Sequence, residues 1–215
     1  MARVASPTSF KIKRSERAFF VGKTGSGKTT LAKALLYAQP HVFILDPKHT
    51  FTLPDSWKHS IYKTMSELES HNDESTAIYR PDLDEMDGGC NEFFELAFAQ
   101  RNRLIFVDEV IRVTPNNRIK PGYKNVLQLG RELNVGCWSA TQRPSSVPIP
   151  IMTEAEHYFI FRLTSMDDRK RLRDWLGYDE LMTVPKDPHG FYHYSDITGK
   201  LVYYSKANLG ILERK

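Results

Sequence analysis

The segment GKTGSGKT, Gly22–Thr29, constrains the fold of this chain more than any other feature. It matches the pattern G-x-x-x-x-G-K-[ST] in full, follows the apolar segment Arg17–Val21 and opens a helix predicted over Lys28–Ala38. Its glycines allow a tight turn with inward-pointing amides, and the helix N-terminus adds positive potential. A chance glycine-rich turn would lack the flanking strand and helix, so the pattern predicts a phosphate-binding loop.

The loop assigns a role to several side chains. Lys28 can reach the β- and γ-phosphates of a nucleotide, and the Thr29 hydroxyl can bind Mg²⁺. The predicted nucleotide-binding residues are Gly22, Lys23, Thr24, Gly25, Ser26, Gly27, Lys28, Thr29 and Thr30. The sequence therefore predicts ATP and Mg²⁺ as ligands.

The segment RLIFVDEV, Arg103–Val110, is the expected partner of this loop. Four apolar residues predict a buried strand that carries Asp108 to the carboxyl edge of a sheet, where ligands bind in open α/β folds. Asp108 would hold Mg²⁺ directly or through water, and Glu109 would polarise a water for attack on the γ-phosphate. Two solvated carboxylates at a strand end are the alternative. An acidic pair beside a complete phosphate loop favours hydrolysis over nucleotide sensing.

Apolar runs alternate with helical patterns, which predicts an α/β fold with a mostly parallel sheet and helices on both faces. Further strands are predicted over His41–Leu45, Ser60–Lys63, Thr76–Arg80, Val135–Thr141 and His157–Phe161, and helices over Ser66–Ser70, Asn91–Gln100, Tyr123–Asn134 and Asp167–Leu176. Near the C-terminus, Gly190–Tyr194 and Lys200–Ser205 flank a turn sequence and predict a β-hairpin.

One domain is expected over residues 1–215, with a basic N-terminal arm at 1–16 and the C-terminal hairpin at 189–206. The acidic segment Glu67–Asp87, next to Gly88 and Gly89, is interpreted as a surface insertion. No apolar run approaches the roughly 20 residues that cross a bilayer, and the two cysteines form no metal or disulfide pattern. We therefore expect a soluble intracellular protein. A net charge of +4 permits a nucleic-acid partner without requiring one.

The segment SATQRPSS, Ser139–Ser146, places an amide at the end of a predicted buried strand. Thr141 and Gln142 would then lie at the same sheet edge as the phosphate loop. Gln142 could hydrogen-bond the attacking water or the γ-phosphate and so report hydrolysis. A polar residue that simply leaves a strand is an equally open interpretation.

The wider segment GRELNVGCWSATQRPSSVP, Gly130–Pro148, resembles the signature of the FtsK–HerA superfamily of DNA-pumping P-loop ATPases. LDPK, Leu45–Lys48, and the order of the motifs resemble this group too, and the resemblance runs from about Phe19 to Gly177. It implies a RecA-like (ASCE) core in which the Gln142 strand lies between the phosphate-loop strand and the Asp108 strand. It also implies a ring, usually a hexamer, around double-stranded DNA, with ATP at the subunit interfaces.

The resemblance further implies an arginine finger donated by a neighbouring subunit from the helix before the T-Q-R-P strand. Arg131 is the matching position. A solvated charge or an ion pair is the alternative for Arg131. Arg143 is its competitor, either as a second arginine acting across the interface or as a brace for its own loop.

In size and layout the chain looks most like the small genome-packaging ATPases of tailless, membrane-containing double-stranded DNA viruses. The membrane spans, DNA-orienting domain and N-terminal barrel of other superfamily members do not fit in 215 residues. This resemblance implies packaging of DNA into a preformed capsid, a portal or vertex protein as partner, and a location in the host cytoplasm or at the packaging vertex.

Candidate DNA contacts are the loop Asn116–Lys124, with Arg118, Lys120 and Lys124, and the basic arm. Such contacts would be independent of base sequence and sensitive to salt, although a solvated basic loop is equally open. The helix Asp167–Trp175 mixes both charges and is interpreted mainly as a salt-bridged surface. His189 and His193 share a strand face by period, but no third metal ligand is evident.

Three other functions remain open. A P-loop kinase for a small substrate would need an acceptor pocket, and ATP consumption without an acceptor would argue against it. A protein or filament export or assembly ATPase could share the core. A DNA-binding module without enzymatic activity would be insensitive to Glu109→Gln.

Overall fold

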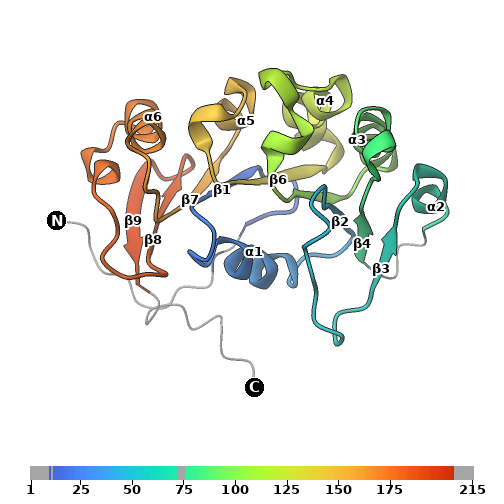
Figure 1. The fold of residues 1–215 in the computed structure, drawn as a ribbon, viewed down its shortest axis with the longest axis horizontal. Helices are drawn as coiled ribbons and strands as arrows, with labels where there is room; N and C mark the ends of the chain where they lie inside the picture. Colours follow the sequence, from blue (N-terminus) through green and yellow to red (C-terminus); the bar gives the residue numbers. More distant parts are fainter. Residues whose placement is uncertain (1–9, 11, 72–75, 206–215) are drawn as a thin grey trace.

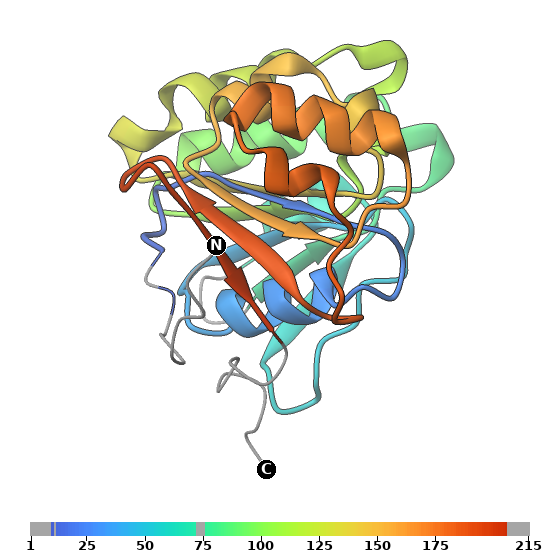
Figure 2. The same ribbon diagram turned by 90° about the vertical axis from the view of Figure 1, so that its left-hand side faces the viewer.

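A nine-stranded sheet forms the centre of the protein in the computed structural model, which describes residues 10, 12–71 and 76–205. The strands are β1 Ala18–Val21, β2 Val42–Leu45, β3 His59–Tyr62, β4 Thr76–Tyr79, β5 Leu104–Val107, β6 Gly136–Thr141, β7 His157–Phe161, β8 Phe191–Ser195 and β9 Lys200–Tyr204. Their order in the sheet is β3-β4-β2-β5-β6-β1-β7-β8-β9. Strands β1 to β7 pair in parallel, and β8 and β9 add antiparallel at one edge (Figure 2). The predicted α/β class, parallel sheet and C-terminal hairpin are confirmed.

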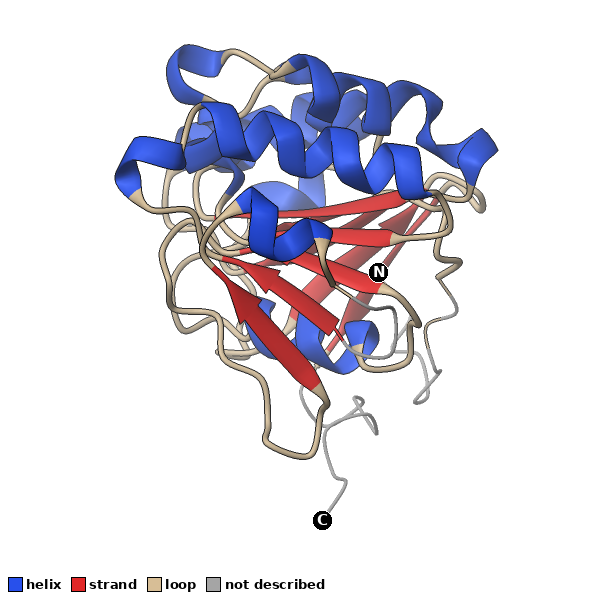
Figure 3. Ribbon diagram, turned by 90° about the vertical axis from the view of Figure 1, so that its right-hand side faces the viewer, coloured by secondary structure: helices blue, strands red, loops and turns tan. Residues whose placement is uncertain are grey.

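Helices cover the two faces of the sheet unequally. They are α1 Lys28–Leu36, α2 Met65–Glu69, α3 Gly88–Gln100, α4 Pro121–Leu129, α5 Ile149–Thr153 and α6 Met166–Leu176. Helix α1 lies on one face, and α2 to α6 line up on the other (Figures 1 and 3). On the α1 face, Phe51 and Leu53 from the loop after β2 complete the apolar core with Leu31 and Leu35. Because both faces are covered, the central strands β1, β2 and β5 are buried along their whole length, as their continuous apolar runs require.

Strand β6 lies between β1 and β5, and this position assembles the candidate site. Val21 pairs with Thr141, and Val107 pairs with Ser139. The chain therefore leaves all three strands at the same edge, with the phosphate loop after β1, Asp108 after β5 and Gln142 after β6. The strand order implied by the T-Q-R-P resemblance is confirmed.

The interpretation of Glu67–Asp87 as a surface insertion is wrong. This segment contains β4, which pairs with β2 on one side and β3 on the other. All four of its residues, Thr76–Tyr79, are buried. The short apolar run forms a buried strand, and the acidic residues Asp82 and Asp84 come after its end.

The helix predicted over Tyr123–Asn134 ends earlier than expected. Helix α4 stops at Leu129, and Gly130–Leu133 forms a 3₁₀ turn that carries Arg131. Asn134 then adopts a left-handed conformation, with φ of 57°, which turns the chain into β6. Arg131 therefore lies on a tight turn and not on the helix itself.

Some predictions fall outside the described residues. They concern residues 1–9 and Lys11 of the basic arm, and Lys206 at the end of the predicted hairpin. Within the described ranges, no helix has both the length and the apolar composition to span a membrane. Cys90 and Cys137 are both buried and free, and burial raises the pKa of each thiol to about 12.

Candidate active site

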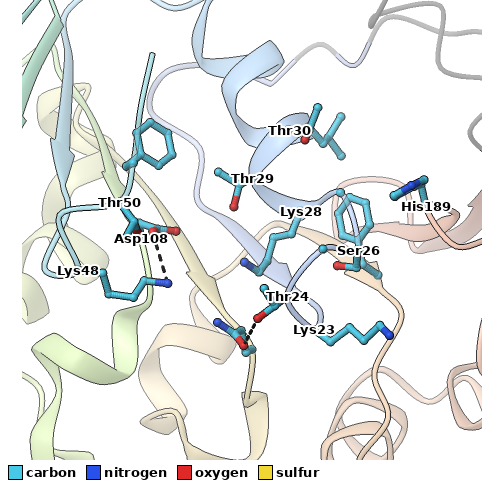
Figure 4. Close-up of a pocket in the computed structure, with 16 residues that line it drawn as sticks. Lys23, Thr24, Ser26, Lys28, Thr29, Thr30, Lys48, Thr50, Asp108 and His189 are labelled. Carbon is cyan, nitrogen blue, oxygen red and sulfur yellow. Dashed lines mark hydrogen bonds and ion pairs between the residues drawn. The ribbon is translucent and has the colours of Figure 1, made fainter. Parts of the chain in front are cut away.

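A cavity of about 430 Å³ opens at the carboxyl edge of the sheet, between the phosphate loop and the loops after β2, β5 and β6 (Figure 4). Its lining comprises Lys23, Thr24, Gly25, Ser26, Gly27, Lys28, Thr29, Thr30, Leu31, Lys48, Thr50, Phe51, Asp108, Gln142, Phe161 and His189. Eight of the nine predicted nucleotide-binding residues are in this set, and Gly22 starts the same loop. The structure thus brings the phosphate loop, Asp108 and Gln142 into one cavity.

The phosphate loop is held by its backbone. The Gly22 amide donates to the Thr141 carbonyl at 3.2 Å, and the Lys23 amide donates to the Arg162 carbonyl at 3.0 Å, so the loop is tied to the ends of β6 and β7. Gly27 precedes α1 with φ of 98°, a conformation that a side chain would strain. No side chain caps α1. The amides of its first turn are therefore available to an anion, and the helix dipole favours one there.

The charges in the cavity are arranged for an anionic ligand accompanied by a cation. Burial lowers the pKa of Lys28, while Asp108 and Glu109 oppose this effect. Burial raises the pKa of Asp108, while Lys48 and Lys28 oppose it. Each charged form is thus partly stabilised by its neighbours and not by water. A triphosphate would favour the charged form of Lys28 further.

The donor set fits Mg²⁺. The Thr29 hydroxyl and the Asp108 carboxylate both line the cavity and are hard oxygen ligands, and a Mg²⁺ bound with a nucleotide takes its remaining ligands from phosphates and water. Such an ion would neutralise phosphate charge. Thr29 and Asp108 are the residues that would hold it.

Glu109 lies beside the cavity and is held in place by several donors. Its backbone is left-handed, with φ of 65°, a conformation that is uncommon for a residue with a side chain. The Thr141 hydroxyl donates to Glu109 Oε1 at 2.9 Å, and the Gln142 side-chain amide donates to Oε2 at 3.0 Å. The Gln142 backbone amide approaches Oε1 at 3.3 Å. The carboxylate proposed to act on water is thus oriented by the end of β6.

Gln142 also reaches the phosphate loop. Its side-chain oxygen accepts a hydrogen bond from the Thr24 hydroxyl at 2.7 Å (Figure 4). One amide therefore connects the phosphate loop to Glu109. Of the two interpretations left open by the sequence, this arrangement favours a site residue over a polar residue that merely ends a strand.

Lys48 is a site residue that the two nucleotide motifs do not contain. Its ammonium lies 3.6 Å from Asp108 Oδ2 and 3.6 Å from Glu109 Oε2, so it bridges the acidic pair. The buried Asp46 carboxylate accepts the Thr50 and Phe51 amides at 3.1 and 2.9 Å, which turns the chain after β2 back toward the cavity. The sequence does contain a signal for Lys48, because LDPK follows a strand that ends at the same sheet edge.

The two candidate finger arginines lie at opposite edges of the sheet. Arg131 comes just before β6, at the amino edge, where it pairs with Glu156 Oε1 at 3.1 Å while its side chain remains 64% exposed. It therefore lies away from the cavity of its own chain. Arg143 follows Gln142 at the nucleotide edge and pairs with the buried Asp168 at 3.5 Å. That contact favours its alternative role as a brace.

The basic loop between β5 and α4 is partly neutralised. Lys120 forms an ion pair with Asp87. Arg118 and Lys124 are exposed and form no ion pair with the described residues. Asn116 and Asn117 are both left-handed, which gives the loop a defined shape in front of α4. Contact of these two side chains with DNA stays a prediction.

Helix α6 and His193 are held by contacts within the fold. The α6 arginines Arg169 and Arg171 donate to the Leu163 and Val147 carbonyls at 3.1 and 3.0 Å, and Arg173 forms an ion pair with Asp174. His189 and His193 do not share a strand face, because His189 precedes β8. His193 instead contacts His157, with 3.2 Å between its Nε2 and His157 Nδ1.

The model of the family "ATPase family associated with various cellular activities (AAA)" matches residues 18–163, more than half of the chain. No curated protein sequence matches the chain.

Solved structures with a similar fold include two viral proteins and one bacterial protein. The genome packaging NTPase B204 from Sulfolobus turreted icosahedral virus 2, in complex with AMPPCP, is 14% identical with a TM-score of 0.71 over 89% of this chain and 98% of that chain. B204, the DNA-packaging ATPase from Sulfolobus turreted icosahedral virus, is 15% identical with a TM-score of 0.70 over the same shares. EssC from Geobacillus thermodenitrificans is 16% identical with a TM-score of 0.57 over 85% of this chain and 38% of that chain. At these identities the likeness shows the fold.

Proposed function

We propose that this chain, which belongs to the ATPase family associated with various cellular activities, hydrolyses ATP to move double-stranded DNA, as the motor that packages a viral genome into a preformed capsid. The observation that best supports ATP hydrolysis is the contact of Gln142 with both Thr24 and Glu109. It connects the nucleotide-binding loop to the candidate base.

The proposal that DNA is the cargo rests on two supports. The T-Q-R-P segment resembles the FtsK–HerA superfamily, and viral proteins described as packaging enzymes share the fold over 98% of their own length. Arg118 and Lys124 would contact the DNA backbone. Because phosphate contacts carry no sequence information, movement would be independent of base sequence.

The protein would act as a ring of identical subunits, a hexamer by resemblance to the FtsK–HerA superfamily, and the position of Arg131 supports this arrangement. Its guanidinium lies at the sheet edge opposite the cavity and is largely exposed, so a neighbouring subunit's nucleotide is the site that it can serve. An arginine acting across an interface accelerates phosphoryl transfer by about 10³- to 10⁵-fold in measured cases. Assembly at a capsid portal or vertex would bring the subunits together, and the protein would act there and in the host cytoplasm.

Steady-state ATP hydrolysis at high protein concentration, with and without double-stranded DNA, tests the proposal. We expect DNA to raise the rate, added salt to reduce this stimulation, and the double variant Arg118→Ala/Lys124→Ala to lose much of it while basal hydrolysis is retained. The matched control is Arg173→Ala, which removes an arginine of helix α6 that is paired with Asp174. Hydrolysis that is indifferent to DNA would support an export or assembly ATPase, a function that the fold shared with EssC also accommodates.

A further inference from the structure

We infer that His189 contacts the base of the bound nucleotide, and that the turn before the C-terminal hairpin therefore sets the affinity of the site for a nucleoside over bare phosphate. This inference rests on the proposed ATPase activity and adds a residue that neither nucleotide motif contains. His189 lines the cavity although it lies 160 residues beyond Thr29.

The cavity has two distinct ends. Asp108 and Lys48 lie at one end and His189 at the other, with Lys28 and Thr29 between them (Figure 4). The candidate general base, Glu109, and the candidate Mg²⁺ ligand, Asp108, belong beside the γ-phosphate. The triphosphate must therefore run from the Asp108 end across the phosphate loop. The nucleoside then leaves past Thr30, toward His189.

His189 is close enough to the phosphate loop to meet a nucleoside there. A Cβ placed on Gly27 would lie 3.5 Å from His189 Nδ1. The imidazole is half-buried and forms no hydrogen bond, ion pair or ring contact with the described residues. A flat ring with free nitrogens at this position can stack on a heteroaromatic base or hydrogen-bond its edge.

The turn that carries His189 is fixed to the hairpin. The Tyr203 hydroxyl of β9 donates to Asp187 Oδ2 at 2.8 Å, and the Gly190 amide donates to the Asp187 carbonyl at 3.1 Å. A Cβ on Gly190 would overlap the Tyr203 hydroxyl, so only glycine allows this close approach. The hairpin therefore holds the histidine in place over the loop, and Tyr203 is its positioning residue.

Equilibrium binding separates recognition of the base from recognition of phosphate. Isothermal titration calorimetry would measure the Kd of a non-hydrolysable ATP analogue and that of inorganic tripolyphosphate, both with Mg²⁺. For His189→Ala we expect the analogue to bind about 5-fold or more weakly, the scale of losing one base stack, with tripolyphosphate unchanged within about 2-fold. His189→Phe should restore part of the affinity. Tyr203→Phe should raise the Kd of the analogue alone, and by a smaller factor than His189→Ala does.

Lys186→Ala is the matched control, because Lys186 is an exposed residue of the same turn and does not line the cavity. It should change neither Kd. Equal weakening of both ligands by His189→Ala, or no change for either, overturns the inference. So does a wild-type protein that binds the analogue no better than tripolyphosphate, a result that leaves the phosphate site and the proposed ATPase intact. Failure of DNA to stimulate hydrolysis would contradict the motor and leave these binding results unaffected.

Discussion

The side chain of Gln142 donates a hydrogen bond from Nε2 to Glu109 Oε2 at 3.0 Å, while its oxygen accepts one from the Thr24 hydroxyl. Oε1 of Glu109 is satisfied by Thr141. Both carboxylate oxygens are therefore engaged within the protein. A water that Glu109 is to polarise must compete with the amide, and a γ-phosphate that draws Thr24 or Gln142 toward itself would release Oε2.

Gln142→Ala should lower kcat while leaving nucleotide binding close to normal. The variant keeps the backbone that holds the phosphates but loses the amide that orients Glu109 and faces the γ-phosphate. We expect kcat to fall about 10- to 100-fold, with KM within about 3-fold, measured by steady-state hydrolysis.

Thr141→Val provides the matched comparison, because it removes the other donor to Glu109 and keeps the branched shape. We expect a fall in kcat of less than about 10-fold and a loss of about 1 kcal/mol in unfolding free energy. Wild-type kcat in both variants would show that the hydrogen bonds around Glu109 do not contribute to hydrolysis.

Glu109→Gln should bind ATP and fail to cleave it. The amide has nearly the same shape but cannot take a proton from water, and general-base groups contribute about 10²- to 10⁴-fold. We expect an affinity for ATP within about 3-fold of wild type and single-turnover cleavage slower by at least about 100-fold. Hydrolysis at the wild-type rate would remove Glu109 from the role of base.

The sequence predicts the parts of the site whose position depends on a local pattern. The phosphate loop and Asp108 each follow a buried strand, and parallel pairing brings their ends together with Gln142. Lys48 and His189 reach the cavity from loops shaped by contacts between residues far apart in the sequence, Asp46 with Arg80 and Asp187 with Tyr203. No periodicity records such contacts. The strand β4 was predicted from its apolar run, whereas its burial inside the sheet depends on pairing with β2 and β3, which the local pattern does not record.

Mixed-subunit hydrolysis should decide which arginine acts across the interface. Arg131→Ala keeps an intact cavity and lacks the finger, whereas Lys28→Ala lacks the phosphate lysine and keeps the finger. Each should be nearly inactive alone. If Arg131 serves a neighbour, mixing them should restore a substantial fraction of wild-type activity, because some interfaces then combine an intact cavity with an intact arginine.

Arg143→Ala mixed with Lys28→Ala is the parallel experiment for the competitor. If Arg143 braces its own loop through Asp168, Arg143→Ala should lose thermal stability and show no complementation. Complementation by Arg143→Ala in place of Arg131→Ala would reverse the assignment.

Lys48→Met should shift the acid limb of the pH profile to higher pH. Burial already raises the pKa of Asp108, and Lys48 is the largest influence that lowers it. Removing this charge raises the pKa further, so Asp108 becomes protonated, and loses its charge for Mg²⁺, at a less acidic pH. The measurement is kcat/KM against pH. Lys23→Met, which removes a cavity lysine that forms no ion pair with Asp108, should leave the limb in place.

The hairpin should make folding stability depend on pH through His193. Burial, and secondarily the nearby His157, lower the pKa of His193 to about 3, against about 6.5 in an unfolded chain. Between these values the unfolded chain binds a proton that the folded chain does not, so unfolding free energy falls as pH falls below about 6.5, by at most about 1.4 kcal/mol per pH unit. Above that range His193 is neutral in both states, so its contribution to the unfolding free energy no longer changes with pH.

Denaturant unfolding at several pH values from 4.5 to 7.5 tests this dependence. His193→Phe retains a ring against Phe159 and Phe10 but cannot be protonated, so its unfolding free energy should decline less steeply with acid than that of the wild type. The variant also loses the contact with His157, which lowers stability at every pH by about 1 kcal/mol. The slope and not the level is therefore diagnostic. His41→Asn replaces an exposed histidine at a left-handed position that asparagine tolerates, and it should keep the wild-type slope. Equal slopes in wild type and His193→Phe would place the acid sensitivity in other groups.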